Sequence, residues 1–216
     1  MNNLSQEFIA FSIKKQVLKF GEFKTKAGRL SPYFFNAGLF NDGESLLQLG
    51  EFYAKSIQNS GLKFDMLFGP AYKGIPLVSA IAIAFAKNGH NYPYAYNRKE
   101  IKDHGEGGTL VGAPLSGRVL IIDDVISAGT SIRESVELIV KEGAQPCGVS
   151  IAMDRQEKGL TSLSAVQEVE QNYDIPVVSI AKLTDLFKFI EGSNDLAQYL
   201  PKVDHYRQLY CINTND

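Results

Sequence analysis

Short apolar runs that alternate with helical stretches constrain the fold of this chain more than any other feature of its sequence. The runs lie at Phe64–Phe68, Tyr92–Tyr96, Val119–Ile122, Val149–Ala152 and Val177–Ile180. Helical patterns follow three of them: one opened by Pro76, a second over Ile132–Glu142 and a third over Leu183–Ile190. Continuous apolar strands separated by helices are typical of a parallel sheet that is buried on both faces. The sequence therefore predicts an α/β fold, in which ligands bind beyond the carboxyl ends of the strands.

The first sixty residues follow a different pattern. Ser5–Phe20 has the apolar spacing of an amphipathic helix, and Leu46–Asn59 returns to that spacing before Gly61 ends it. The stretch between them, GEFKTKAGRLSPYFFNAG, is rich in aromatic residues, glycines and short alternations, which predicts small strands and turns. We expect one domain over residues 1–216, with these strands forming a small appendage.

Composition and charge exclude several classes of protein. The net charge of −2 provides no global basic field for nucleic acid or an anionic membrane. The longest apolar-rich stretch, Ile75–Ala86, is too short to span a bilayer. Cys147 and Cys211 lie far apart, and the three histidines do not cluster at ligand spacing. We therefore expect a cytoplasmic protein with two reduced thiols, without a zinc site and without a nucleic-acid or membrane partner.

Two adjacent carboxylates, Asp123 and Asp124, directly follow the apolar run Val119–Ile122. Such a place is costly for charge unless hydrogen bonds or cations offset it. The small, hydroxyl-rich loop at residues 127–131 can surround a phosphate at the start of a helix. Ser131 and Glu134 also fit a capping box, so a capped helix behind solvated acids is the simpler alternative.

The whole run VLIIDDVISAGTS is more specific than its parts, and it resembles the PRPP-binding signature of the type I phosphoribosyltransferases. The resemblance implies that the two aspartates hold the ribose hydroxyls of PRPP and that the loop binds its 5-phosphate. The PRPP-binding residues implied here are Asp123, Asp124, Val125, Ile126, Ser127, Ala128, Gly129, Thr130 and Ser131. Many relatives have threonine where this chain has Ser127, and the hydroxyl is retained. Because no GxxxxGK[ST] occurs and no GxGxxG follows a strand, nucleotide-hydrolysing and dinucleotide-binding classes are excluded.

A second loop, Gly69-Pro70-Ala71-Tyr72-Lys73-Gly74, also follows an apolar run and leads into a helix. A lysine on a turn is usually exposed to solvent without a binding role. At the end of a strand and the start of a helix, however, a lysine and free backbone amides can bind a diphosphate. The family resemblance implies that Tyr72 and Lys73 contact the diphosphate end of PRPP. Loops at this place in the family can contain a non-proline cis peptide, which we expect at Ala71–Tyr72.

Cations and glycines are concentrated in the segment NRKEIKDHGEGG, residues 97–108. A charge run is usually a solvated surface, here an exposed hairpin, but a cationic lid over residues 97–110 can also close over a diphosphate and exclude water. The segment resembles the catalytic loop of the orotate phosphoribosyltransferases almost letter for letter. The resemblance implies that Arg98, Lys99, Lys102 and His104 contact the diphosphate, with Lys102 most important for its departure. In the family this loop reaches the neighbouring subunit's site, which implies a homodimer with shared sites.

Two further segments indicate which base the predicted transferase binds. The aromatic cluster of residues 20–40 resembles the family's hood, which implies that Phe34 and Phe35 lie against orotate and that Lys26 reaches PRPP and the base. Core packing is the alternative for Tyr33 and at least one of these phenylalanines. Arg155 follows the run Val149–Ala152 and is able to grip a carboxylate bidentately, although a salt bridge to Asp154 or Glu157 is the commoner role. Orotate differs from uracil by a carboxylate, so Arg155 is the expected specificity residue, with Ser127 also at the base.

The resemblance as a whole implies the type I phosphoribosyltransferase fold, a mainly parallel sheet with a hood. It implies a Mg²⁺-dependent orotate phosphoribosyltransferase in which Mg²⁺ is held mainly by substrate oxygens. A transferase for uracil or a purine, a PRPP-sensing regulator and a magnesium phosphatase using Asp123 are the alternatives. The residues after Leu186 resemble the family only loosely and assign no site.

Overall fold

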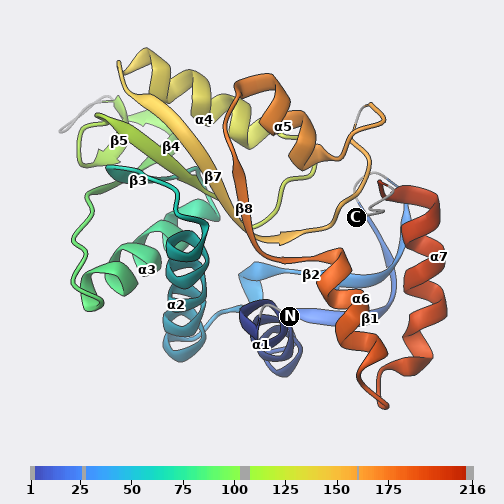
Figure 1. The fold of residues 1–216 in the computed structure, drawn as a ribbon. Helices are drawn as coiled ribbons and strands as arrows, with labels where there is room; N and C mark the ends of the chain where they lie inside the picture. The colour runs from blue at the N-terminus through green and yellow to red at the C-terminus, as the bar shows by residue number, and fades with distance from the viewer. Residues whose placement is uncertain (1–2, 26–27, 103–107, 160, 213–216) are drawn as a thin grey trace.

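The computed structural model describes residues 3–25, 28–102, 108–159 and 161–212 of the chain (Figure 1). Its strands are β1 (Leu18–Lys24), β2 (Leu30–Phe35), β3 (Met66–Gly69), β4 (Tyr94–Lys102), β5 (Gly108–Gly112), β6 (Arg118–Ile122), β7 (Gln145–Asp154) and β8 (Val177–Lys182). Its helices are α1 (Asn3–Lys14), α2 (Gly43–Ser60), α3 (Gly74–Lys87), α4 (Thr130–Lys141), α5 (Ala165–Tyr173), α6 (Leu183–Glu191) and α7 (Leu200–Tyr210), with short 3-10 turns at Ala37–Leu39 and Ala197–Tyr199. None of these helices is long and apolar enough to cross a membrane.

A six-stranded sheet in the order β5-β4-β3-β6-β7-β8 forms the centre of the molecule. The strand pairs from β4 through β8 are parallel, and only β5 runs antiparallel, on the outer edge beside β4. Every apolar run named above lies in or overlaps a strand of this sheet, so the predicted α/β fold with a mainly parallel sheet is confirmed.

Helices cover both faces of the sheet. Helices α2 and α3 pack on one face, and α4 and α5 pack on the other (Figure 1). Alternate residues of one strand therefore enter different cores: Leu120 and Ile122 of β6 lie in the core on the α2–α3 side, whereas Val119 and Ile121 lie in the core under α4 and α5. The absence of polar residues from this run is explained by that two-sided burial.

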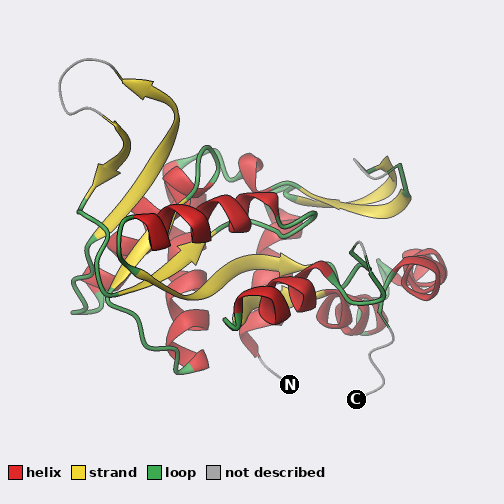
Figure 2. Ribbon diagram, turned by 90° about the horizontal axis from the view of Figure 1, so that it is seen from above, coloured by secondary structure: helices red, strands yellow, loops and turns green. Residues whose placement is uncertain are grey.

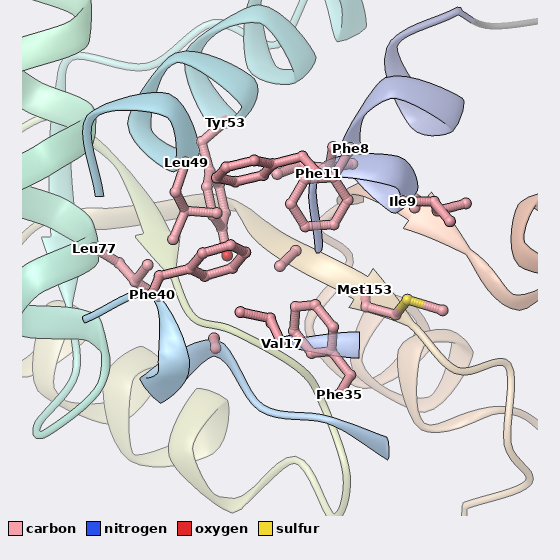
Figure 3. Close-up of a cluster of buried hydrophobic side chains, with 14 of the residues drawn as sticks. Phe8, Ile9, Phe11, Val17, Phe35, Phe40, Leu49, Tyr53, Leu77 and Met153 are labelled. Atoms are coloured by element: carbon pink, nitrogen blue, oxygen red, sulfur yellow. The ribbon is translucent and has the colours of Figure 1, made fainter. Parts of the chain in front are cut away.

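The hood is the two-stranded antiparallel sheet β1–β2, next to α7. Its inner side chains, among them Tyr33 and Phe35, join the same core as α1 and α2. Phe35 is shown in this core with Phe8 of α1 and Tyr53 of α2 in Figure 3. Phe35 packs against Phe8 of α1 with ring centroids 6.2 Å apart. The hood thus shares its hydrophobic core with the main sheet.

The predicted helix Ser5–Phe20 is too long, because α1 ends at Lys14. Gln16 adopts φ of 59°, which no helix tolerates, and the chain then enters β1 at Leu18. Val17 and Leu18 are buried at the start of the strand, so their apolar character fitted a helical and an extended assignment equally well.

The lid segment forms the arms of a hairpin that reaches away from the body of the molecule (Figure 2). Strand β4 is longer than the predicted Tyr92–Tyr96, since it runs on through the basic residues to Lys102 and pairs with β5. A hairpin is therefore confirmed by its two arms and is exposed at Lys99 and Glu100, while residues 103–107 lie outside the described part of the chain.

Candidate active site

The two aspartates at the end of β6 are buried, with relative exposures of 8% for Asp123 and 5% for Asp124. The Asp123 carboxylate accepts a hydrogen bond from the Ser131 hydroxyl at 2.8 Å, and its backbone carbonyl accepts one from the Tyr53 hydroxyl at 2.7 Å. Burial, and next the charge of Asp124, raise the pKa of Asp123 to about 6. Two acceptor carboxylates are thus fixed at the carboxyl edge of the sheet, where ligands bind in such folds.

Lys73 offsets part of this charge. Its ammonium lies 2.6 Å from the Asp124 carboxylate, which joins the predicted diphosphate loop to the predicted ribose-binding acids. The lysine side chain is 55% exposed, so a ligand can reach it from solvent. The neighbouring Tyr72 is also exposed, and the Ala71–Tyr72 peptide is cis, as the sequence predicted.

The loop after Asp124 leads into α4 through Gly129, which adopts φ of 69°. A residue with a side chain is strained in that conformation, so the glycine is required by the turn. Ser127, Ala128 and Thr130 are exposed around it, and the backbone amides at the start of α4 are available to a phosphate.

The predicted capping box of Ser131 and Glu134 is wrong. The residue that caps α4 is Gly129, and no side chain caps this helix. The Ser131 hydroxyl bonds to Asp123 instead, which links the loop to the acidic pair. A capping pattern in sequence does not reveal such a competing acceptor from an earlier strand.

The base of the lid lies against the diphosphate loop. Asn97 of β4 accepts a hydrogen bond from the Ala71 amide at 2.8 Å, and the Lys99 ammonium lies 5.4 Å from the centre of the Tyr72 ring. Arg98 is half-buried, and its Nη1 has no hydrogen-bond partner in the described part of the chain. The backbone of Lys102 ends β4, but its side chain and all of His104 lie outside what the structure describes.

Arg155 directly follows β7 and is largely enclosed, with a side-chain exposure of 13%. It forms an ion pair with Glu157 at 2.6 Å and lies over the Tyr33 ring at 4.5 Å. Its Nη2 also donates to the Ser31 hydroxyl at 3.2 Å, which connects β7 to the hood. Glu157 occupies the Nε–Nη2 edge, so the predicted bidentate grip on a ligand is not available in this conformation, and Nη1 is the group left for one.

The two hood phenylalanines differ in orientation. Phe34 is 39% exposed and stacks on Phe23 at 5.4 Å, which leaves its ring available to a flat ligand. Phe35 is buried in the core, which confirms the core-packing alternative for one of the two phenylalanines. Any contact of Phe35 with a base would therefore come from its backbone. Lys26 lies outside the described residues.

The acidic pair is the candidate metal-binding group at this edge. Over the described part of the chain, no group of three or more His, Cys, Asp or Glu residues is placed to hold a metal ion. Mg²⁺ is commonly held by one or two carboxylates together with substrate phosphates, and Asp123 and Asp124 beside the phosphate-binding loop fit that arrangement. Both cysteines are free thiols.

Comparison with known proteins places this chain in a family. Residues 38–180 match the family described as phosphoribosyl transferase domain. An orotate phosphoribosyltransferase of Chromobacterium violaceum is 66% identical over 213 residues, which cover 99% of this chain and 100% of the relative. The chain belongs to the orotate phosphoribosyltransferase family.

Other members of the family agree with this assignment. The orotate phosphoribosyltransferase of Neisseria meningitidis serogroup C is 64% identical over 98% of the chain and all of its own length. The crystal structure of the Francisella tularensis orotate phosphoribosyltransferase is 45% identical, with a TM-score of 0.87, and covers 95% of this chain and 99% of the other. The fold is therefore the type I phosphoribosyltransferase fold, and the chain is an enzyme of the glycosyltransferase class.

Several residues of this candidate site had no role assigned from the sequence. Tyr53 supports Asp123, Asn97 holds the predicted diphosphate loop, and Tyr206 of α7 donates to Glu157 at 2.7 Å. Asn97 stood inside the recognised lid segment, which was a usable signal. Tyr53 and Tyr206 reach the site from helices distant in sequence, where no motif marked them.

Proposed function

We propose that this chain catalyses transfer of the phosphoribosyl group from PRPP to N1 of orotate, giving orotidine 5′-monophosphate and diphosphate. The observation that carries this proposal is the meeting of Lys73 with Asp124 beside the loop 127–131, because it combines acceptors for a ribose with donors for phosphates. The names of relatives at up to 66% identity supply the base. In this reaction N1 of orotate releases its proton to solvent and bonds to ribose C1, and the bond from C1 to diphosphate breaks with its electron pair leaving on the diphosphate.

Positive charge develops on the ribose carbon as diphosphate leaves, so catalysis depends on positioning and electrostatics rather than on a protein nucleophile. Asp123 and Asp124 would hold the ribose hydroxyls, and residues 127–131 would hold the 5-phosphate. Tyr72, Lys73 and the lid residues Arg98, Lys99, Lys102 and His104 would bind the diphosphate, with Lys102 assisting its departure.

The base would lie between the hood and the end of β7. Phe34 offers an exposed ring, Arg155 offers Nη1 to the carboxylate, and Ser127 and Lys26 are the remaining proposed contacts. The cationic lid would exclude water, which otherwise hydrolyses the activated ribose.

The reaction is proposed to depend on Mg²⁺, held mainly by the oxygens of PRPP with Asp123 and Asp124 as the nearest protein carboxylates. Bound there, the ion would neutralise charge on the diphosphate. We further propose that the enzyme works in the cytoplasm, in the biosynthesis of UMP, as a homodimer with shared sites.

The proposal is tested by the loss of orotate absorbance after addition of PRPP and Mg²⁺, with diphosphate measured in parallel. Orotate loss that a chelator stops, with one diphosphate released per orotate consumed, is the expected result. Turnover of uracil or a purine in place of orotate would contradict the assigned base. No turnover of any base, with PRPP still bound, would indicate a PRPP-sensing protein instead.

A further inference from the structure

Glu157 lies between two arginines at the junction of β7, the hood and α7. Its Oε1 accepts from Arg155 Nε at 2.7 Å, and its Oε2 lies 3.4 Å from Arg29 Nη1. The side chains of Arg29, Arg155 and Glu157 are 22%, 13% and 19% exposed, so all three are largely withdrawn from water. These three groups in contact carry a net charge of +1. The cluster thus presents two cations and one carboxylate to an anionic ligand, with the Asp154 carboxyl as a further acidic group nearby.

Arg155 is fixed on three sides within this cluster. The Tyr33 ring lies beneath the guanidinium, Glu157 takes Nε and Nη2, and Nη2 also donates to Ser31 at 3.2 Å and to the Tyr206 hydroxyl at 3.4 Å. Nη1 makes no hydrogen bond among the described residues. One donor group of defined direction is thus left at the end of β7.

The Tyr206 hydroxyl contacts both charged partners. It donates to Glu157 Oε1 at 2.7 Å and accepts from Arg155 Nη2. Burial, and next the hydrogen bond to Glu157, raise the pKa of Tyr206 to about 12, so the hydroxyl keeps its proton at neutral pH. Its ring packs edge-on against Tyr33 at 6.2 Å, so the packing of α7 depends on the ring and the contacts to the charges depend on the hydroxyl.

We propose that Glu157 and Tyr206 are positioning residues for the base: they hold Arg155 so that its Nη1 meets the carboxylate of a pyrimidine carboxylate substrate. The inference rests on the proposed function, which it deepens by giving α7 a part in base selection. Arg155 without these partners would keep its charge but lose its direction, and a fixed donor binds a carboxylate better than a mobile one does.

The decisive variant is Tyr206→Phe, which removes the hydroxyl and keeps the ring. The KM for orotate is expected to rise about 5- to 20-fold, which is less than the full effect of losing a hydrogen bond to a charged group, because Tyr206 acts on the substrate only through Arg155. The KM for PRPP and kcat are expected to stay unchanged, because neither depends on the substrate carboxylate. Tyr210→Phe is the matched control, since it removes a hydroxyl one helical turn away that has no hydrogen-bond partner in the described chain. Equal losses for orotate and PRPP, or no change in either KM, would overturn the inference.

Glu157→Gln separates positioning from competition between Glu157 and the substrate, because the two explanations predict opposite changes in the KM for orotate. If Glu157 merely competes with the substrate for Arg155, removing its charge lowers the KM for orotate, and that result overturns the positioning role. Positioning predicts a higher KM for orotate and a smaller preference for orotate over uracil, which has no carboxylate to meet Nη1. Wild-type protein that does not use orotate refutes the proposed function and this inference together. Wild-type turnover of orotate with an unchanged Tyr206→Phe variant refutes the inference alone.

Discussion

Asp123 illustrates, at the level of one residue, how a site is made at the expense of stability. Its carboxyl has a pKa of about 6 in the folded protein, above the value near 4 of an unfolded chain. Above pH 6 the group is ionised in both states, and the folded state bears the full unfavourable burial of the charge. As the pH falls from about 6 to about 4, the folded protein takes up the proton first and this destabilisation disappears.

Asp123→Asn is therefore expected to raise the free energy of unfolding at pH 8 by about 1–3 kcal/mol, since each unit of pKa shift corresponds to about 1.4 kcal/mol. The gain should be smaller at pH 5. Turnover should fall about tenfold or more, because a charged acceptor for the ribose is lost. Urea unfolding at the two pH values and an orotate assay measure both effects.

The exposed Asp195 provides the control, and Asp195→Asn should change neither quantity. A variant at position 123 that is less stable at pH 8 than the wild type would show that the asparagine loses more in hydrogen bonding than it gains by removing the charge.

The candidate site residues that could be predicted from the sequence lie in short continuous motifs. Asp123, Asp124 and Lys73 stood at strand ends, where the α/β pattern already predicted a ligand, and the structure joins them. The direction of a side chain was not predictable in the same way. Phe34 and Phe35 are neighbours with similar chemistry, yet strand alternation exposes one and buries the other, and the register that decides between them depends on the whole hood.

At the scale of elements, the close approach of α2 and α3 limits which side chains can be accommodated between them. Gly50 of α2 faces α3, and a Cβ at that position would lie 2.7 Å from the carbonyl oxygen of Ala80. Gly43, at the start of the same helix, has open space around it. The two glycines look alike in sequence and differ only in what another helix brings near them.

Gly50→Ala is expected to lower the free energy of unfolding by about 1–3 kcal/mol, since the backbone of α3 must move to admit a methyl group. Gly43→Ala should leave stability unchanged or raise it by up to about 1 kcal/mol through the better helix propensity of alanine. Chemical denaturation of the pair measures the difference. If the two variants were equally stable, the tight contact between α2 and α3 would be refuted.

Strand β4 belongs both to the sheet and to the lid, and Asn97 marks where one becomes the other. Its hydrogen bond to the Ala71 amide ties the lid base to the diphosphate loop. Asn97→Ala should raise the KM for PRPP about 3- to 10-fold, because a hydrogen bond of this kind contributes about 0.5–1.5 kcal/mol. Steady-state kinetics with each substrate varied in turn test this expectation.

The KM for orotate should change little in Asn97→Ala, and Asn91→Ala, in the exposed loop before β4, should behave as the wild type. An equal rise in both KM values would show that the bond supports the whole sheet edge rather than the diphosphate loop.

Elements were predicted well where one physical signal dominated. Two-sided burial made β6 a continuous apolar run and made the buried part of β7 apolar except for Gly148 and Ser150, and both assignments are confirmed. The end of α1 was missed because Val17 and Leu18 suit either element, and the length of β4 was missed because a charged hairpin arm has no apolar pattern. In both cases the deciding contacts, with β2 and β5, come from other parts of the chain.

At the scale of the whole molecule, a site shared between subunits predicts an activity that depends on two different chains in one dimer. The described arms of the hairpin β4–β5 reach away from the body of the molecule (Figure 2), which fits the proposal that the lid serves a neighbouring subunit. A Lys102→Ala subunit has a defective lid and an intact ribose-binding pocket, whereas an Asp123→Asn subunit has an intact lid and a defective ribose-binding pocket. If each lid serves the partner's pocket, a mixed dimer contains one site built from two intact halves.

Equal amounts of the two impaired variants, unfolded and refolded together, should then recover about a quarter of wild-type activity, because about half of the dimers are mixed and each has one fully working site of two. Each variant refolded alone should keep only its own low activity. If the lid instead closes over its own subunit, every site in the mixture retains one defect, and the activity does not exceed the average of the two variants. Recovery that grows on mixing and disappears when the dimers are first cross-linked separately would therefore assign the lid to the neighbouring subunit.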